Sequence, residues 1–206
     1  MSSLSEFLQS KRANVCSGII LATIWGVFAY AHLTGFQKTQ NWALFLFFFS
    51  ETLTAGFYLF RSNPKTVSVD PFDWLAAIGG TFAPLFFRPT SWGILPVASI
   101  AIMAGTCIQM LGLISLNRSF AIVAAKREIK SAWMYRIVRH PIYASYCLTF
   151  TGYLLANTSF ANLLIYLASI VFLCIRIFRE EKHLALDALY RTYMRKVRYR
   201  LIPFIF

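Results

Sequence analysis

The chain has 206 residues, of which 58% are hydrophobic and 14% are charged, and its formal net charge is +12. Soluble domains contain roughly 45–50% apolar and about 25% charged residues, so this composition excludes an ordinary soluble protein and indicates an all-α, polytopic membrane protein. The basic residues show no interleaved aromatic platform of the kind that binds nucleic acid. We therefore expect the lipid bilayer, with its anionic headgroups, to be their partner.

Six apolar windows predict membrane-spanning helices within a single integral membrane domain, residues 1–206. A helix needs about 20 apolar residues to cross about 30 Å of hydrocarbon, and the third and fifth windows are short enough to be tilted or re-entrant segments instead. The windows are Val15–Leu33, Trp42–Phe60, Phe72–Phe87, Trp92–Leu116, Ile142–Ala156 and Phe160–Ile177. The first four form a scaffold (1–116). A polar loop, a helical hairpin and a basic tail make up the second half (117–206).

The distribution of basic residues predicts the orientation of the chain. Six spans place both termini on one side of the membrane, and 18 of the 20 Lys and Arg residues fall on that side, leaving only Lys38 and Arg88 on the other. Positive residues accumulate in cytoplasmic loops. We therefore expect both termini to face the cytoplasm.

The C-terminal tail predicts a helix that lies in the headgroup plane. Apolar side chains recur at helical spacing and basic side chains take the other positions, which is typical of an amphipathic interfacial helix. The apolar set is Leu186, Leu189, Tyr190, Tyr193 and Val197.

Several familiar sites are absent from the sequence. The four cysteines lie in or beside apolar windows without close pairing, so they indicate neither a disulfide framework nor a metal site. The chain also lacks the G-x-G-x-x-G and P-loop patterns. A nucleotide-bearing cofactor would therefore need a different architecture.

The stretch Tyr135-Arg-Ile-Val-Arg-His-Pro-Ile-Tyr143 concentrates polar side chains at the mouth of the predicted hairpin. His140-Pro141 stands where a helix should begin, and the free N–H groups of a helix start attract anions. Tyr143 follows His140 by three residues and shares its helical face. A structural reading stays open: Arg139 as a snorkelling anchor, His140 as a cap and Tyr143 as an interfacial aromatic.

The other end of the hairpin carries Glu180 and Glu181, and Arg176 lies four residues earlier on the face of Glu180. The hairpin should return these residues to the side of Arg139 and His140. Carboxylates could then meet the cationic groups of a cofactor, while an arginine met the carboxylate of a substrate. Glu51 is an acid in the middle of a predicted span. It could be functional or bonded to a neighbouring helix, and we leave it outside the predicted site.

These motifs, with Arg176-x-x-x-Glu180-Glu181 and then Tyr190-x-x-Tyr193, resemble those of the isoprenylcysteine carboxyl methyltransferase family. The resemblance covers roughly residues 117–206 and implies an integral membrane enzyme that uses S-adenosylmethionine. It implies a bacterial branch of the family, and hence a bacterial inner membrane. It also implies a lipophilic acceptor, which is a carboxylate in the family's name-giving reaction.

The resemblance, together with the placement of the charged residues, implies a set of site residues. Candidate catalytic residues are Arg176 and Arg139, of which Arg176 would meet the substrate carboxylate. Candidate cofactor-binding residues are Arg127, Ile129, Lys130, Tyr135, His140, Pro141, Tyr143, Glu180 and Glu181. No metal is implied.

The chain departs from the family pattern at three places. Ser131-Ala132-Trp133 replaces a Thr-x-Gly element, Ser145 replaces a glycine, and Asp187-Ala188-Leu189 stands where a Phe-Gly element is usual. The first two changes are expected to narrow the pocket.

Two other functions stay open. Membrane sterol and steroid reductases share a His-Pro-x-Tyr hairpin but use NADPH, and a non-enzymatic protein could keep the motif alone.

Overall fold

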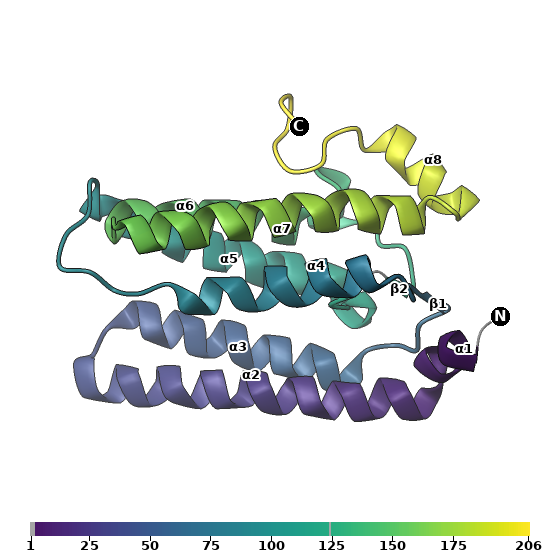
Figure 1. Ribbon diagram of the computed structural model, residues 1–206, viewed down its shortest axis with the longest axis horizontal. Coiled ribbons are helices and arrows are strands. Elements are labelled where there is room, and N and C mark those ends of the chain that lie inside the picture. The colour runs from purple at the N-terminus through teal and green to yellow at the C-terminus, as the bar shows by residue number, and fades with distance from the viewer. Residues whose placement is uncertain (1–2, 124) are drawn as a thin grey trace.

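The computed structural model describes residues 3–123 and 125–206, and helices dominate it (Figure 1). The all-α, polytopic architecture predicted from the composition is confirmed. The α-helices are α1 (Ser3–Gln9), α2 (Lys11–Thr39), α3 (Trp42–Phe60), α4 (Pro71–Phe82), α5 (Ser99–Leu116), α6 (Pro141–Ala156), α7 (Phe160–Leu184) and α8 (Ala188–Lys196). Short 3-10 helices are η1 (Ala83–Phe86), η2 (Pro96–Ala98), η3 (Asn117–Ser119) and η4 (Trp133–Arg136). Strands β1 (Thr66–Val67) and β2 (Ala125–Lys126) pair antiparallel.

Each of the six apolar windows contains a helix, but the helices differ in length. Among the described residues, four segments are long and apolar enough to cross a membrane, namely α2, α3, α5 with its flanking 3-10 turns, and α7. The third and fifth windows form α4, of 12 residues, and α6, of 16 residues. At about 1.5 Å per residue, α6 is about 24 Å long, so a full crossing by these two stays a prediction. Helix α7 continues seven residues beyond its window, to Leu184, and Glu180 and Glu181 lie within it.

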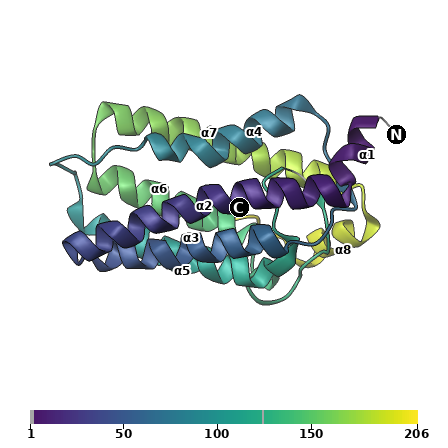
Figure 2. The same ribbon diagram turned by 90° about the horizontal axis from the view of Figure 1, so that it is seen from below.

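The long helices run alongside one another (Figures 1 and 2). α2 packs on α3, α5 packs on both α3 and α6, and α7 packs on α6 and α4. The α2–α3 and α6–α7 turns lie at one end of the bundle, whereas α1, the β1–β2 pair and α8 lie at the other (Figure 1). This second end, at which α2, α4 and α6 begin and α3, α5 and α7 end, brings the polar segments of the chain together. That it faces the cytoplasm stays a prediction.

Close packing of α5 on α6 fixes the position of the His-Pro helix start. A Cβ at Gly105 would lie 2.2 Å from Thr149 Oγ1, and one at Gly112 would lie 2.8 Å from Ile142 Cγ1. Glycine allows the two backbones to approach closely, as is usual between helices in a membrane. The α5–α6 pair therefore forms a rigid wall beside His140.

An ion-pair cluster attaches α4 to α7 at the polar end of the bundle. Arg179 on α7 donates to the carboxylates of Asp73 and Asp70, and Ser68 donates to the second oxygen of Asp73. Asp73 is buried, whereas the side chain of Asp70 is 42% exposed. The cluster therefore depends mainly on Asp73.

The Asp73→Asn variant should lower the free energy of unfolding by about 1–3 kcal/mol, because Arg179 loses a buried charged acceptor. The shift of the thermal melting curve in detergent measures this effect. The Asp70→Asn variant is the control, and its half-exposed carboxylate should contribute less than about 1 kcal/mol. Equal melting temperatures for the two variants would contradict this account.

Candidate active site

A cavity of about 270 Å³ lies between the helices and reaches the polar end of the bundle. Side chains of α2, α4, η1 and α6 give it an apolar wall, which includes Trp25, Phe28, Phe82, Leu85 and Phe150. The other wall is polar and comes from residues 125–130, η4, the start of α6, the end of α7 and α8. The cavity could thus hold a ligand with a charged part and a lipophilic part.

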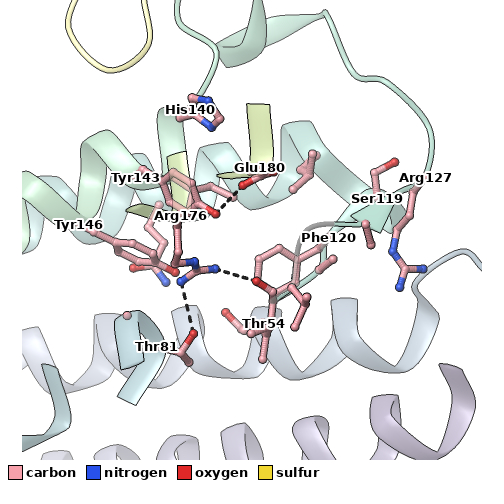
Figure 3. A pocket seen from close by; sticks show the side chains of 18 of the residues that line it. Thr54, Thr81, Ser119, Phe120, Arg127, His140, Tyr143, Tyr146, Arg176 and Glu180 are labelled. Atoms are coloured by element: carbon pink, nitrogen blue, oxygen red, sulfur yellow. Dashed lines mark hydrogen bonds between the residues drawn. The ribbon is translucent and has the colours of Figure 1, made fainter. Parts of the chain in front are cut away.

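The cavity brings most of the predicted site residues together, although they come from four separate segments. Nine of the eleven line it, and Figure 3 shows several of them around the hollow. These nine are Arg127, Ile129, Lys130, Tyr135, Arg139, His140, Tyr143, Arg176 and Glu180. Pro141 and Glu181 are not among the lining residues. Pro141 is fully buried at the first position of α6, where it shapes the helix start.

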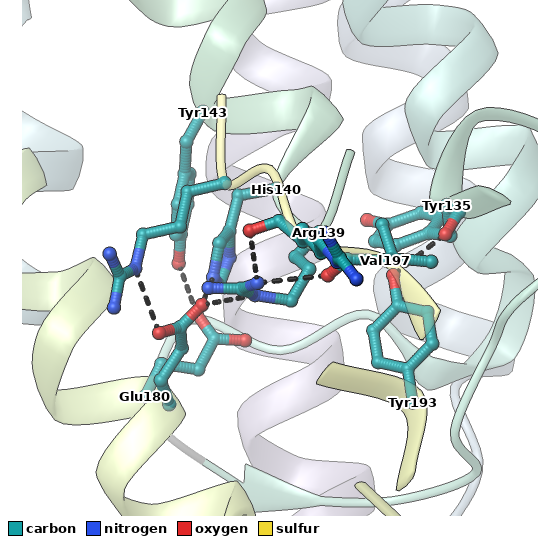
Figure 4. Close-up of polar contacts among 10 residues, drawn as sticks. Tyr135, Arg139, His140, Tyr143, Glu180, Tyr193 and Val197 are labelled. Carbon is teal, nitrogen blue, oxygen red and sulfur yellow. Dashed lines mark hydrogen bonds and ion pairs between the residues drawn. The ribbon is translucent and has the colours of Figure 1, made fainter. Parts of the chain in front are cut away.

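Glu180 presents a carboxylate beside two stacked rings. The Tyr143 hydroxyl donates to Glu180 Oε2 over 2.6 Å, and the His140 and Tyr143 rings lie nearly parallel with centroids 5.3 Å apart (Figure 4). Carboxylates and aromatic faces both attract cations. This corner of the cavity is therefore suited to a positively charged group of a ligand.

Arg176 reaches into the middle of the cavity from α7. Its Nη1 donates to Thr81 Oγ1 over 3.3 Å and its Nη2 to the carbonyl of Ile122 over 3.0 Å (Figure 3). Its guanidinium also lies over the Tyr143 ring, 5.1 Å from the centroid. Gly80 on α4 makes room for it, since a Cβ there would lie 2.9 Å from Arg176 Cδ. Among the described residues Arg176 forms no ion pair with a carboxylate, so this buried cation can meet an anionic group of a ligand.

Glu181 lies behind His140 and connects α7 to the start of α6. Its Oε1 accepts from Arg139 Nε over 2.6 Å and lies 3.1 Å from His140 Nε2, and its Oε2 accepts from Arg200 Nε over 2.9 Å. Both carboxylate oxygens are thus occupied by protein groups, and the residue is 4% exposed. In this structure the Glu181 carboxylate therefore binds Arg139, His140 and Arg200, and its predicted contact with a cofactor stays a prediction.

The same network holds the C-terminal tail against the helix start. Arg139 Nη1 donates to the carbonyls of Val197 and Arg198, at 2.9 and 2.7 Å (Figure 4). The backbone N–H groups of Arg139 and His140 donate to the carbonyls of Tyr199 and Arg200, each over 2.9 Å. Arg139 lines the cavity, but most of its donors serve this network.

Helix α8 closes the polar end of the cavity. Tyr190 and Tyr193 line the cavity and are buried, and the Tyr193 hydroxyl donates to the carbonyl of Tyr135 over 2.7 Å. Burial raises the pKa of Tyr193 and of Tyr135, so both phenols keep their protons. Leu186 and Leu189 remain exposed. Of the predicted apolar face, Tyr190, Tyr193 and Val197 are therefore buried in the protein, whereas the two leucines face its surroundings.

The sequence prediction missed Glu51 and misjudged two substitutions. Glu51 lines the cavity from α3, and its Oε2 is buried without a hydrogen-bond partner among the described residues. Its position as an acid in the middle of a predicted span was a signal that could have included it. Ser145 is fully buried and donates to the carbonyl of Ile142, and Trp133 is exposed. Neither lines the cavity, so the expected narrowing does not occur.

The fold and the cavity define a polytopic helical protein with a charged and lipophilic binding site at one end of the bundle. Residues 91–191 match the family described as phospholipid methyltransferase. This matched segment thus belongs to the family of membrane methyltransferases that includes the phospholipid and isoprenylcysteine carboxyl methyltransferases. A comparison with curated proteins gave no match.

Proposed function

We propose that this protein is an S-adenosylmethionine-dependent methyltransferase that modifies a lipophilic acceptor at the cytoplasmic face of the membrane. One observation carries the proposal: the Glu180–Tyr143–His140 corner, Arg176 and the apolar wall belong to one cavity. The family match supports methyl transfer as the reaction class.

The residues at the polar end fit the cofactor. S-adenosylmethionine supplies a methyl group on a positively charged sulfur, and it also carries an ammonium and a carboxylate. Glu180 and the ring faces of His140 and Tyr143 would hold the cationic groups. Tyr135 and the segment that contains Ile129 and Lys130 would enclose the rest, with α8 excluding water.

Arg176 supports an acceptor that carries an anionic group, such as a carboxylate. Its guanidinium lies between the Glu180 corner and the apolar wall, where the head of a lipophilic acceptor would be placed. A carboxylate would accept the methyl group in a single displacement that releases S-adenosylhomocysteine and needs no general base. Positioning alone can then supply up to about 7–11 kcal/mol of the barrier reduction. The lipophilic part would lie along the apolar wall, in contact with Trp25 and Phe82.

The Glu180→Gln variant tests the cofactor site. We expect its dissociation constant for S-adenosylhomocysteine to rise at least about tenfold, because a hydrogen-bonded charge contributes about 1.5–3 kcal/mol. Calorimetry on the detergent-solubilised protein measures this affinity. Glu6→Gln, which removes an exposed carboxylate on α1, is the matched control and should bind like the unmodified protein.

The same titration discriminates between the candidate functions. Binding of NADPH in place of S-adenosylhomocysteine would favour a reductase, and binding of neither by a folded protein would favour a non-enzymatic role. Unchanged affinity for S-adenosylhomocysteine in Glu180→Gln would show that the cofactor lies elsewhere.

A further inference from the structure

Four polar side chains, which we call the inner cluster, line the cavity near the middle of three helices. Glu51 is the tenth residue of the 19-residue helix α3, and Gln109 lies near the middle of α5. Tyr146 and Thr149 come from α6, where Thr149 follows Pro141 by eight residues, or about 12 Å along the helix axis. All four line the cavity. The inner cluster therefore lies deeper than the His140 corner, at a level where we expect the bundle to meet hydrocarbon.

The protein leaves the hydrogen-bonding capacity of the inner cluster open. Glu51 Oε2 and Thr149 Oγ1 are buried without a hydrogen-bond partner. The side chains of Gln109 and Tyr146 also form no hydrogen bond in the part of the chain that the structure describes. Polar groups inside a membrane are costly without partners, and a carboxyl group is the most costly of these four. Apolar residues would avoid this cost if the positions served packing alone, so the inner cluster points to a polar group of a ligand.

The chemistry of the inner cluster indicates that this ligand group is a hydroxyl. An amide, a phenol and a hydroxyl offer both donors and acceptors, and a carboxyl group accepts or, when protonated, donates. A ligand hydroxyl both donates and accepts, so it can pair with several of these groups at once. A cationic group fits less well, because Tyr146 lies within electrostatic reach of Arg176 as well as of Glu51, and Arg176 would repel a cation.

The inner cluster and Arg176 can be reached by one ligand, because they line the same cavity. Figure 3 shows Tyr146 beside Arg176, on the opposite side of it from Arg127. An anionic head at Arg176 would thus leave the lipophilic part of the ligand to extend toward the inner cluster. A plain hydrocarbon chain would cover these polar groups without giving them a partner.

We propose that the inner cluster binds a hydroxyl group on the lipophilic part of the acceptor, while Arg176 holds the anionic head. The acceptor class is then a hydroxylated lipophilic carboxylate. This inference rests on the proposed function for the position of the head, and it makes the acceptor of that function more specific.

Matched pairs of acids test the inner cluster. Octanoic, decanoic and dodecanoic acid are compared with their ω-hydroxy derivatives, because the reach from Arg176 to Glu51 selects one chain length. Each acid is titrated calorimetrically into the full-length protein in an uncharged detergent. We expect one hydroxy acid to bind at least about threefold more tightly than its plain counterpart, since buried polar groups gain a partner. An apolar cavity would show the reverse preference, because it would bury the hydroxyl group unpaired.

Three variants locate the effect on α3. In Glu51→Leu the preference should reverse, so that the plain acid binds at least about threefold more tightly than the hydroxy acid. Glu51→Gln keeps a hydrogen-bonding group and should keep the preference. Thr52→Leu makes a polar-to-apolar change at the next residue, which is exposed, and should behave like the unmodified protein.

Two further measurements keep these comparisons interpretable. The readout is the ratio of the two dissociation constants, so that partition of the acids into micelles cancels between variants. Glu51→Leu should also melt no earlier than the unmodified protein, because a buried polar group without a partner is removed.

Four results would overturn the inference. The unmodified protein could prefer the plain acid at every chain length, which would assign the inner cluster to water, or it could bind neither acid. Glu51→Leu could keep the preference for the hydroxy acid. An ω-amino acid of the same length could bind more tightly than the hydroxy acid, which would indicate a cation site. Affinity for S-adenosylhomocysteine is measured separately, so that failure of the hydroxyl site is distinguished from failure of the proposed methyl transfer.

Discussion

The Arg176→Ala variant is expected to lose methyl transfer by about 10²–10³-fold while it keeps its affinity for S-adenosylhomocysteine within about threefold. The range is that observed when one preorganised donor is removed from a reacting oxygen. Arg176 is buried and held by Thr81 and Ile122, so its position is fixed before a ligand arrives. Transfer of labelled methyl groups from S-adenosylmethionine into a total lipid extract measures the rate, and calorimetry measures the affinity.

Two further variants make the test of Arg176 more specific. Arg176→Lys keeps the charge but loses the planar donors, so it should recover only part of the rate. Arg88→Ala changes an exposed arginine at the far end of the bundle and should leave both quantities unchanged. A parallel loss of rate and cofactor affinity in Arg176→Ala would place this arginine at the cofactor instead of the acceptor.

The parts of the site that the sequence alone could locate depend on residues that lie close together in the chain. The His140-Pro141 start, the paired acids of α7 and the returning hairpin were readable because each depends on short sequence spacing and on a turn. The cavity then confirms that these segments meet. Tyr143 and Glu180 lie at the two ends of the hairpin that meet, and the Tyr143 hydroxyl donates to the Glu180 carboxylate.

The missed features depend on contacts between distant segments. Glu180 faces the cavity, whereas Glu181 binds arginines. This difference follows from Arg200, which reaches Glu181 only because the tail folds back on the helix start. Arg127 and Arg61 lie 66 positions apart and share Asn14, a pairing that no local pattern reveals. The extension of α7 beyond its predicted apolar window likewise depends on polar contacts, such as that of Arg179 with Asp73.

The Glu181→Gln variant is expected to lower the free energy of unfolding more than the Glu180→Gln variant does. The substitution keeps the shape of the side chain but leaves Arg139, which is buried, and Arg200 without their carboxylate. Breaking a buried ion pair from one side typically costs about 3–5 kcal/mol, and we expect about 3 kcal/mol here because Arg200 is partly exposed. The melting temperature in detergent should fall, and trypsin should cut the tail between Arg195 and Arg200 faster.

Glu180→Gln is the matched control for this experiment, because it makes the same chemical change at the next residue of the same helix. The two carboxylates differ in their partners, since Glu180 faces the cavity and Tyr143, whereas Glu181 faces two arginines and His140. We therefore expect opposite outcomes. Glu180→Gln should lose affinity for S-adenosylhomocysteine at nearly unchanged stability and tail protection, and Glu181→Gln should lose stability and tail protection. Similar melting curves and similar proteolysis in the two variants would mean that the tail is held by the backbone pairing of Arg139 and His140 alone.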